Sequence, residues 1–125
     1  MKIEIKNRWN NSVIFTCDVV SVSIAVKMAI EAKISLRYAN LRSANLRYAD
    51  LSSANLRYAN LDFSCWPLWC GSNNVKVDLK IAAQIAAHFC VLDCKDKKYL
   101  AAKKAILKFA LTSHRAVDLK LIKGA

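Results

Sequence analysis

Leucine recurs at strict intervals of five residues through the middle of the chain, between residues 34 and 64. Each of the last five of these leucines has an alanine two positions before it and Asn or Asp directly before it. A helix would scatter positions five apart around its surface, and a strand would place alternate ones on opposite faces. The pattern therefore predicts a solenoid that turns a corner every five residues, with leucine and alanine pointing inward and Asn or Asp stabilising the corner. The leucines are Leu36, Leu41, Leu46, Leu51, Leu56 and Leu61.

A different pattern, alternation of apolar and polar residues, precedes the repeats. Ile3, Ile5 and Trp9 share one side of the first segment, and the alternation returns over residues 13–19. The pair Asn10-Asn11 between them suits a turn that needs a positive φ. These features predict a β-hairpin with one buried face that includes Trp9.

Helical spacing of apolar residues predicts helices on both sides of the repeats. One helix is expected from Ser21 or Ser23 to about residue 33, where it would cover the open end of the solenoid. After the repeats, the tryptophans and the proline of residues 65–74 predict an aromatic lid on the other end. Two helices should follow, over residues 78–92 and 96–111, and the first should be largely buried because its apolar residues cover more than one face.

The repeat unit A-(N/D)-L-x-x resembles that of the pentapeptide-repeat proteins. The resemblance implies a right-handed quadrilateral β-helix with four repeats per coil, so that this stretch would form about one and a half coils. Residues twenty apart, such as Leu36 and Leu56, would then be stacked. The implied fold class is α+β: a single domain over residues 1–125, with an N-terminal hairpin and capping helix (1–33), pentapeptide repeats (34–64) and a C-terminal helical cap (65–125).

Size and composition fit one compact domain. The chain has 125 residues, of which 55% are hydrophobic, and only 2 Gly and 1 Pro. No apolar run has the length of a membrane span, and the alternating, charged N-terminus does not resemble a signal peptide. We therefore expect a cytoplasmic protein without membrane contact, in which the five cysteines are thiols or metal ligands.

The net charge is strongly positive at +11. Residues 65–125 hold 11 of the 20 basic residues and 4 of the 9 acidic ones. A basic protein attracts nucleic acid, anionic membranes or acidic protein surfaces, although such a charge can also serve solubility alone. It excludes one activity known in the family, the imitation of DNA by an acidic surface.

The outward positions of the repeats combine arginine with tyrosine, which suits a binding surface because arginine donates paired hydrogen bonds and tyrosine offers a flat ring. The alternative is that these residues only fill solvent-exposed positions. The candidate surface comprises Arg37, Tyr38, Arg42, Arg47, Tyr48, Arg57 and Tyr58.

A second candidate surface lies in the C-terminal region. Lys97, Lys104 and Lys108 have the spacing of one helix face, and they could contact the phosphates of a nucleic acid.

Four cysteines form a candidate zinc site: Cys65, Cys70, Cys90 and Cys94. Zinc takes four soft ligands in a tetrahedron, and Cys90 and Cys94 would share one side of a continuous helix. The alternative is that these are structural thiols and that the protein has no cofactor. His88 is expected to be a core residue or one that supports neighbouring ligands, and no combination of nucleophile and base predicts an enzyme.

These observations predict a non-enzymatic binding protein. Small size and an opening hairpin resemble the pentapeptide-repeat proteins of phages and prophages, which implies a host protein as the partner, with a host defence enzyme such as a CRISPR effector as one candidate for inhibition. Two alternatives stay open: sequence-nonspecific binding of nucleic acid, and a zinc-stabilised structural domain or homodimer.

Overall fold

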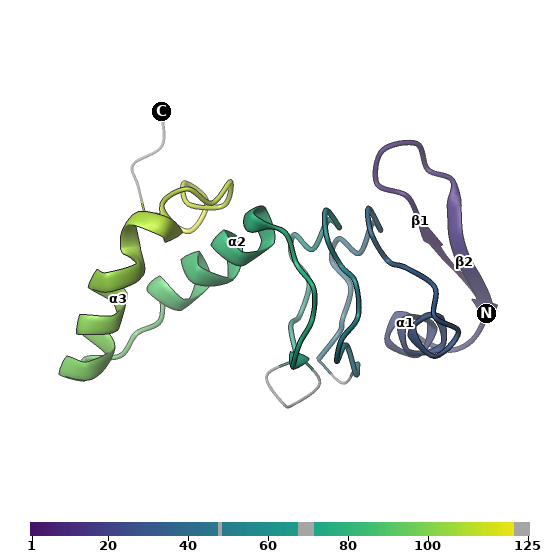
Figure 1. Cartoon of the computed structure of the whole chain (residues 1–125), viewed down its shortest axis with the longest axis horizontal. Helices are drawn as coiled ribbons and strands as arrows, with labels where there is room; N and C mark the ends of the chain where they lie inside the picture. Colours follow the sequence, from purple (N-terminus) through teal and green to yellow (C-terminus); the bar gives the residue numbers. More distant parts are fainter. Residues whose placement is uncertain (48, 68–71, 122–125) are drawn as a thin grey trace. The chain divides into compact units, whose positions relative to one another are not determined.

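A computed structural model describes residues 1–47, 49–67 and 72–121. It divides into two compact units, Met1–Asp78 and Leu79–Ala125, which are considered separately. Helices and a two-stranded sheet occur together, in agreement with the predicted α+β class, whereas the single-domain assignment stays a prediction. The elements are β1 (Lys2–Lys6), β2 (Val13–Asp18), α1 (Val22–Glu31), α2 (Leu79–Cys90) and α3 (Lys97–Ala110) (Figure 1).

The predicted hairpin is confirmed. Strands β1 and β2 pair antiparallel, with Ile3 opposite Cys17 and Ile5 opposite Phe15, and the register shifts after Ile5. Ile5 is almost fully buried. The expectation that Trp9 lies on the buried face is wrong, because this side chain is 73% exposed. The turn that follows β1 breaks the alternation before it reaches Trp9.

Helix α1 begins at a serine cap, as predicted, and packs within the first unit. The side-chain oxygen of Ser21 accepts a hydrogen bond from the backbone N–H of Ile24 (3.3 Å), and the Ser23 hydroxyl donates to the carbonyl of Asn45 in the repeats. Its inner face is fully buried through Ala25, Val26 and Ala29. Caps of this kind typically stabilise a helix by about 1 kcal/mol.

Backbone hydrogen bonds join residues about twenty apart and wind the repeats into a coil. The N–H of Leu36 donates to the carbonyl of Asn55 (3.2 Å), and the N–H of Leu41 donates to that of Asn60 (2.9 Å). Parallel bridges such as that between Asn40 and Asn60 confirm the predicted stacking. These bridges are isolated, so the described part of the coil contains no continuous strand.

The coil continues beyond the last repeat, contrary to the expectation that it ends near residue 64 beneath an aromatic lid. Ser53 donates its N–H to the carbonyl of Asn73 (3.0 Å), and Leu56 donates to that of Lys76 (2.9 Å). The spacing between donor and acceptor is one residue longer here than in the first layer, which places one extra residue between Cys65 and Asn73. Residues 68–71, including Trp69, lie outside the described residues.

Leucine and alanine fill the inside of the coil, as predicted. All six leucines are at most 6% exposed, and the repeat alanines at most 8%. Burying one leucine side chain contributes roughly 1.5–3 kcal/mol, so these rows supply much of the stability of the first unit. The alanines are Ala39, Ala44, Ala49, Ala54 and Ala59.

The second unit is a pair of helices around a small core. Ala87 and Cys90 of α2 and Ala110 of α3 are fully buried. The expectation that α2 is largely buried is wrong in part, because Leu79 is 73% exposed and Ile85 is 41% exposed. A two-helix unit of this size can cover only one face of α2.

Side chains close the ends of both helices in this unit. The carboxylate of Asp96 accepts from the N–H of Lys98 (2.7 Å) and caps α3, as its sequence suggests. The Tyr99 hydroxyl donates to the carbonyl of Phe89 (2.7 Å) at the end of α2. Burial raises the pKa of this hydroxyl, which therefore stays protonated as a donor at neutral pH.

Candidate functional site

Five corners of the coil, all within the described residues, have the same backbone conformation. Tyr38, Ser43, Ser53, Tyr58 and Phe63 have φ angles of 61–64°. At each of these corners a leucine carbonyl accepts from the backbone N–H three residues later, which belongs to an alanine except at the last corner, where Ser64 donates to Leu61. This is the hydrogen bond of a type II turn. The residue with positive φ stands at the third position of this turn, so its side chain lies outside the coil.

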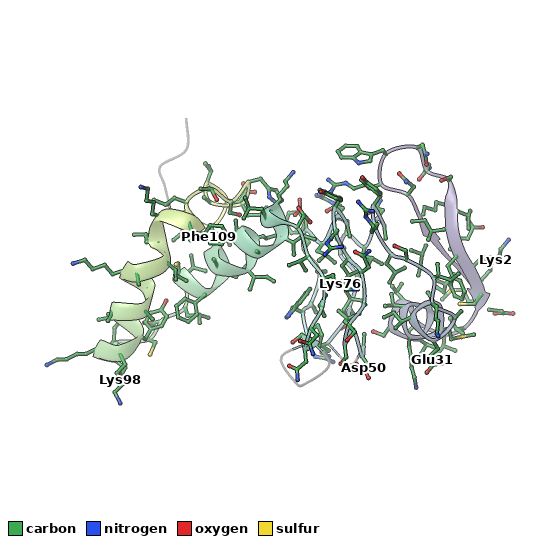
Figure 2. The ribbon with its side chains drawn as sticks, in the orientation of Figure 1. Lys2, Glu31, Asp50, Lys76, Lys98 and Phe109 are labelled. Atoms are coloured by element: carbon green, nitrogen blue, oxygen red, sulfur yellow. The ribbon has the colours of Figure 1, made fainter. Side chains whose placement is uncertain are left out.

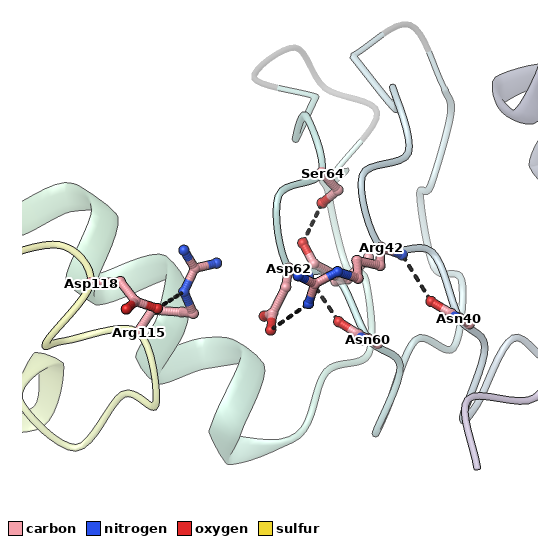
Figure 3. A network of polar contacts seen from close by, with 8 residues as sticks. Asn40, Arg42, Asn60, Asp62, Ser64, Arg115 and Asp118 are labelled. Carbon is pink, nitrogen blue, oxygen red and sulfur yellow. Dashed lines mark hydrogen bonds and ion pairs between the residues drawn. The ribbon is translucent and has the colours of Figure 1, made fainter.

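Asparagine and aspartate side chains complete the corners, as predicted. The Oδ1 atom of Asn40 accepts from the N–H of Arg42 (3.2 Å), and that of Asn60 accepts from the N–H of Asp62 (3.0 Å) (Figure 3). At Asp50 the same contact is made with Ser52, whose hydroxyl and N–H both lower the pKa of the carboxyl group. Each corner is thus held by a backbone bond and a side-chain bond.

Tyr38 and Tyr58, twenty residues apart, stack on one another at such corners. Their ring centroids are 5.3 Å apart and the rings are inclined by only 14°. The guanidinium of Arg37 lies over both rings, 5.5 Å from the centre of Tyr38 and 5.4 Å from that of Tyr58. An exposed cation–π contact contributes about 0.5–1 kcal/mol, so the arginine is held in place on the tyrosine pair.

The turn after β1 adds two residues to this surface that the sequence analysis missed. The N–H of Arg8 donates to the carbonyl of Tyr38 (2.7 Å), and its guanidinium donates to that of Tyr58 (3.1 Å). The same guanidinium lies 4.4 Å from the ring centre of Trp9. An Arg-Trp pair next to a turn was the available signal, but the alternation predicted that Trp9 lies inside.

We call this surface the aromatic corner. It combines three basic and three aromatic side chains: Arg8, Trp9, Arg37, Tyr38, Arg57 and Tyr58. Tyr38 is 37% exposed and Tyr58 is 44% exposed, and Trp9 is more exposed than either. In the described part of the chain, no acidic side chain forms an ion pair with Arg8, Arg37 or Arg57. The positive charge of the corner is therefore available to an anionic group.

Arg42, which the sequence analysis also assigned to the candidate surface, differs from these arginines because it pairs with an acidic side chain. The Arg42 guanidinium lies 4.6 Å from the ring centre of Phe63. It also pairs with Asp62 (3.9 Å between Nη1 and Oδ2), as Figure 3 shows. Its charge is thus partly balanced within the coil. Arg47 is exposed, and Tyr48 lies outside the described residues.

The family comparison agrees with this geometry. Residues 34–65 match the model of the family described as "Pentapeptide repeats (8 copies)". These residues are pentapeptide repeats. Searches of curated proteins and of solved structures return no match. Pentapeptide-repeat proteins generally have structural or binding roles and are not enzymes.

Outside the pentapeptide repeats, the lysines of the alternative surface lie as predicted. Lys97, Lys104 and Lys108 are all exposed on α3, on one side of the helix. Figure 2 shows a further lysine, Lys98, extending away from the same helix. Residue pairs three or four apart share a helix face, so the three lysines could follow a line of phosphates.

The candidate zinc ligands do not lie as expected from the sequence. Helix α2 ends at Cys90, so Cys94 belongs to the following loop and the two thiols do not share a helix face. Cys90 is buried, whereas Cys65 and Cys94 are exposed, and Cys70 lies outside the described residues. Among the residues described, no group of three His, Cys, Asp or Glu side chains could hold a metal.

In the second unit, the surroundings of His88 explain the direction in which its pKa is shifted. His88 is exposed on α2, contrary to the expectation of a core position. Partial desolvation of its ring, and secondly the positive charge of Arg115, lower its pKa. Arg115 is itself buried and pairs with Asp118 at 3.0 Å (Figure 3).

None of the helices in the described part of the chain has the length and apolarity that a membrane crossing requires.

Proposed function

We propose that this chain is a non-enzymatic binding protein that engages an acidic surface of a protein partner through the aromatic corner. The observation that carries the proposal is the combination of three exposed rings with three arginines that form no ion pair with a described acidic side chain. Tyrosine, tryptophan and arginine are the residues that most often dominate the binding energy of protein interfaces. Carboxylates of the partner would supply negatively charged acceptors for the guanidinium groups.

Rigidity supports the same proposal. The Arg37 guanidinium is held on two rings, and Arg8 is tied to the backbone of two layers of the coil. Side chains that are already ordered lose less conformational entropy on binding, which otherwise costs about 0.5–1.5 kcal/mol for each immobilised side chain. The coil that carries them is, in this proposal, a right-handed β-helix with four five-residue sides per turn, a form that the twenty-residue bonding distance supports.

A host protein is the partner that the resemblance to phage and prophage members implies, and inhibition of a host defence enzyme such as a CRISPR effector would be one outcome. The experiment is capture of partners from bacterial lysate on the immobilised protein, with and without nuclease treatment. We expect a protein to be retained after nuclease treatment and lost with the Trp9→Ala/Tyr58→Ala double variant. A matched variant far from the corner in the sequence, Lys27→Ala, should retain it.

Two results would contradict the proposal. One is equal capture by the corner variant and the native protein. The other is capture that disappears with nuclease, which would favour the second candidate function. That candidate is nonspecific nucleic-acid binding, and it rests on the exposed row of Lys97, Lys104 and Lys108 on α3.

A further inference from the structure

Strand β2 has an unpaired outer edge. Within the residues that the structure describes, the sheet has two strands, and β1 is the one next to the coil, where its end bonds to residues 38–40 (Figure 1). We infer that the outer edge of β2 pairs with β2 of a second copy of this chain, which gives a homodimer through a four-stranded sheet. This inference does not depend on the aromatic corner.

The register shows which backbone groups face outward. Val19 donates its N–H to the carbonyl of Met1 (3.0 Å), and bonded pairs alternate along an antiparallel ladder. The opposed residues Ile3 and Cys17 are therefore a bonded pair, as are Ile5 and Phe15. The residues between them on β2, Thr16 and Asp18, direct their N–H and carbonyl groups away from β1. No described residue forms a backbone hydrogen bond with these groups.

The edge also lacks the features that usually prevent pairing. Natural edge strands are protected by lysine, by proline, by bulges or by a covering segment. Strand β2 (VIFTCD) has no lysine or proline, and its one charged residue, Asp18, is at its end. The register shift lies at the other end, near Val13, and leaves Ile14 to Asp18 regular. Strand β1, in contrast, carries Lys2, Glu4 and Lys6.

A second copy is the occupant that fits this edge best. Antiparallel pairing about a twofold axis joins each outward donor to an identical outward acceptor, so the edge is complementary to itself. With Thr16 opposite Thr16 of the other copy, Ile14 lies opposite Asp18, and no like charges face each other directly. A threonine pair across two strands is favourable through hydrogen bonding of the hydroxyls.

Analytical ultracentrifugation over a range of concentrations, combined with hydrogen exchange of single amides, tests the inference on the full chain. We expect the apparent mass to double as the concentration rises. Exchange at the Thr16 and Asp18 amides should slow over the same range, while the Phe15 and Cys17 amides are protected throughout. Salt should strengthen the dimer, because each copy carries a charge of +11.

Two substitutions at one position separate pairing from folding. Thr16→Pro removes an outward N–H without removing a bond to β1, so we expect loss of the dimer. Thr16→Val keeps the N–H and should keep the dimer. A monomer at every concentration, or a dimer without protection at Thr16, would overturn the inference, and these results can be read from the native chain alone. Arg37→Ala, which alters the proposed partner surface, should leave the dimer unchanged.

Discussion

The N–H of Tyr58 donates to the carboxylate of Asp78 at 2.7 Å. One layer earlier, the N–H of Tyr38 donates to the backbone carbonyl of Arg57 (3.2 Å). The Asp78 side chain thus takes the place of a backbone acceptor at the end of the coil. It accepts from the Tyr58 N–H, which would otherwise have no backbone carbonyl of a following layer to bond with. Asp78 is also the last residue of the first unit.

We expect Asp78→Ala to lower the free energy of unfolding by about 1.5–3 kcal/mol, the usual contribution of a hydrogen bond to a charged group. Asp78→Asn keeps an acceptor oxygen and should cost less. Urea denaturation followed by circular dichroism gives both values. Equal losses in the two variants would show that the bond to Tyr58 is not what Asp78 contributes.

The coil could be predicted from the five-residue repeat, because the leucine positions indicate which residues are buried and the asparagine positions indicate where the chain turns. The extra residue between Cys65 and Asn73 removed that signal, so Cys65 and residues 72–78 could not be recognised as a continuation of the coil. Their place in it depends on backbone bonds to the preceding layer, which no side-chain pattern reveals. Asp78 could be read as a helix cap, but its bond to Tyr58 follows only from the layered structure.

The candidate site was partly predictable for the same reason. Arg37, Tyr38 and Tyr58 follow from the corner positions of the repeat. Arg8 and Trp9 join them only because the end of β1 pairs with the coil, a contact between segments about thirty residues apart in the sequence.

Adjacent residues of one repeat provide a matched test of the coil. Leu56 is fully buried and Arg57 is exposed. Leu56→Ala should destabilise the protein by roughly 2–5 kcal/mol through lost burial and a cavity, whereas Arg57→Ala should change stability by no more than about 0.5 kcal/mol. Thermal or urea unfolding measures the difference. Comparable losses would mean that leucine does not face inward.

The positive φ at the corners makes a prediction about residue type. Ser53 has φ of 61°, a conformation that costs a residue with a Cβ atom roughly 1–2 kcal/mol. Ser53→Gly removes this cost but loses more chain entropy on folding, so we expect a gain of at most about 1 kcal/mol. Ser53→Val should destabilise the protein, because β-branched residues are strongly disfavoured there. If valine were tolerated as well as glycine, the corner conformation would be refuted.

Zinc binding through Cys65, Cys70, Cys90 and Cys94 remains a prediction. It requires about one equivalent of zinc in the purified protein and a lower thermal midpoint after chelation. Cys94→Ser is the cleaner variant, because Cys94 is exposed whereas Cys90 is part of the packed core. It should abolish the bound metal, and Cys17→Ser should not. Metal-free protein in which the exposed thiols of Cys65 and Cys94 react freely with a thiol reagent would exclude the site.

The dependence of binding on salt separates the two candidate functions. If Lys97, Lys104 and Lys108 contact phosphates, each lysine replaced should reduce the slope of log affinity against log salt by about 0.7–0.9, because fewer counterions are released. Replacing all three by glutamate should then nearly abolish nucleic-acid binding with little change in stability, since the three side chains are exposed.

A protein partner bound at the aromatic corner should instead tolerate the triple variant and show a shallow salt slope. Its affinity should fall with Tyr58→Ala or Arg37→Ala, because these changes dismantle the stack that holds the guanidinium. Fluorescence anisotropy with labelled single-stranded DNA, and with the captured protein, measures both slopes. A steep slope that disappears in the triple variant would show that α3, and not the corner, carries the function.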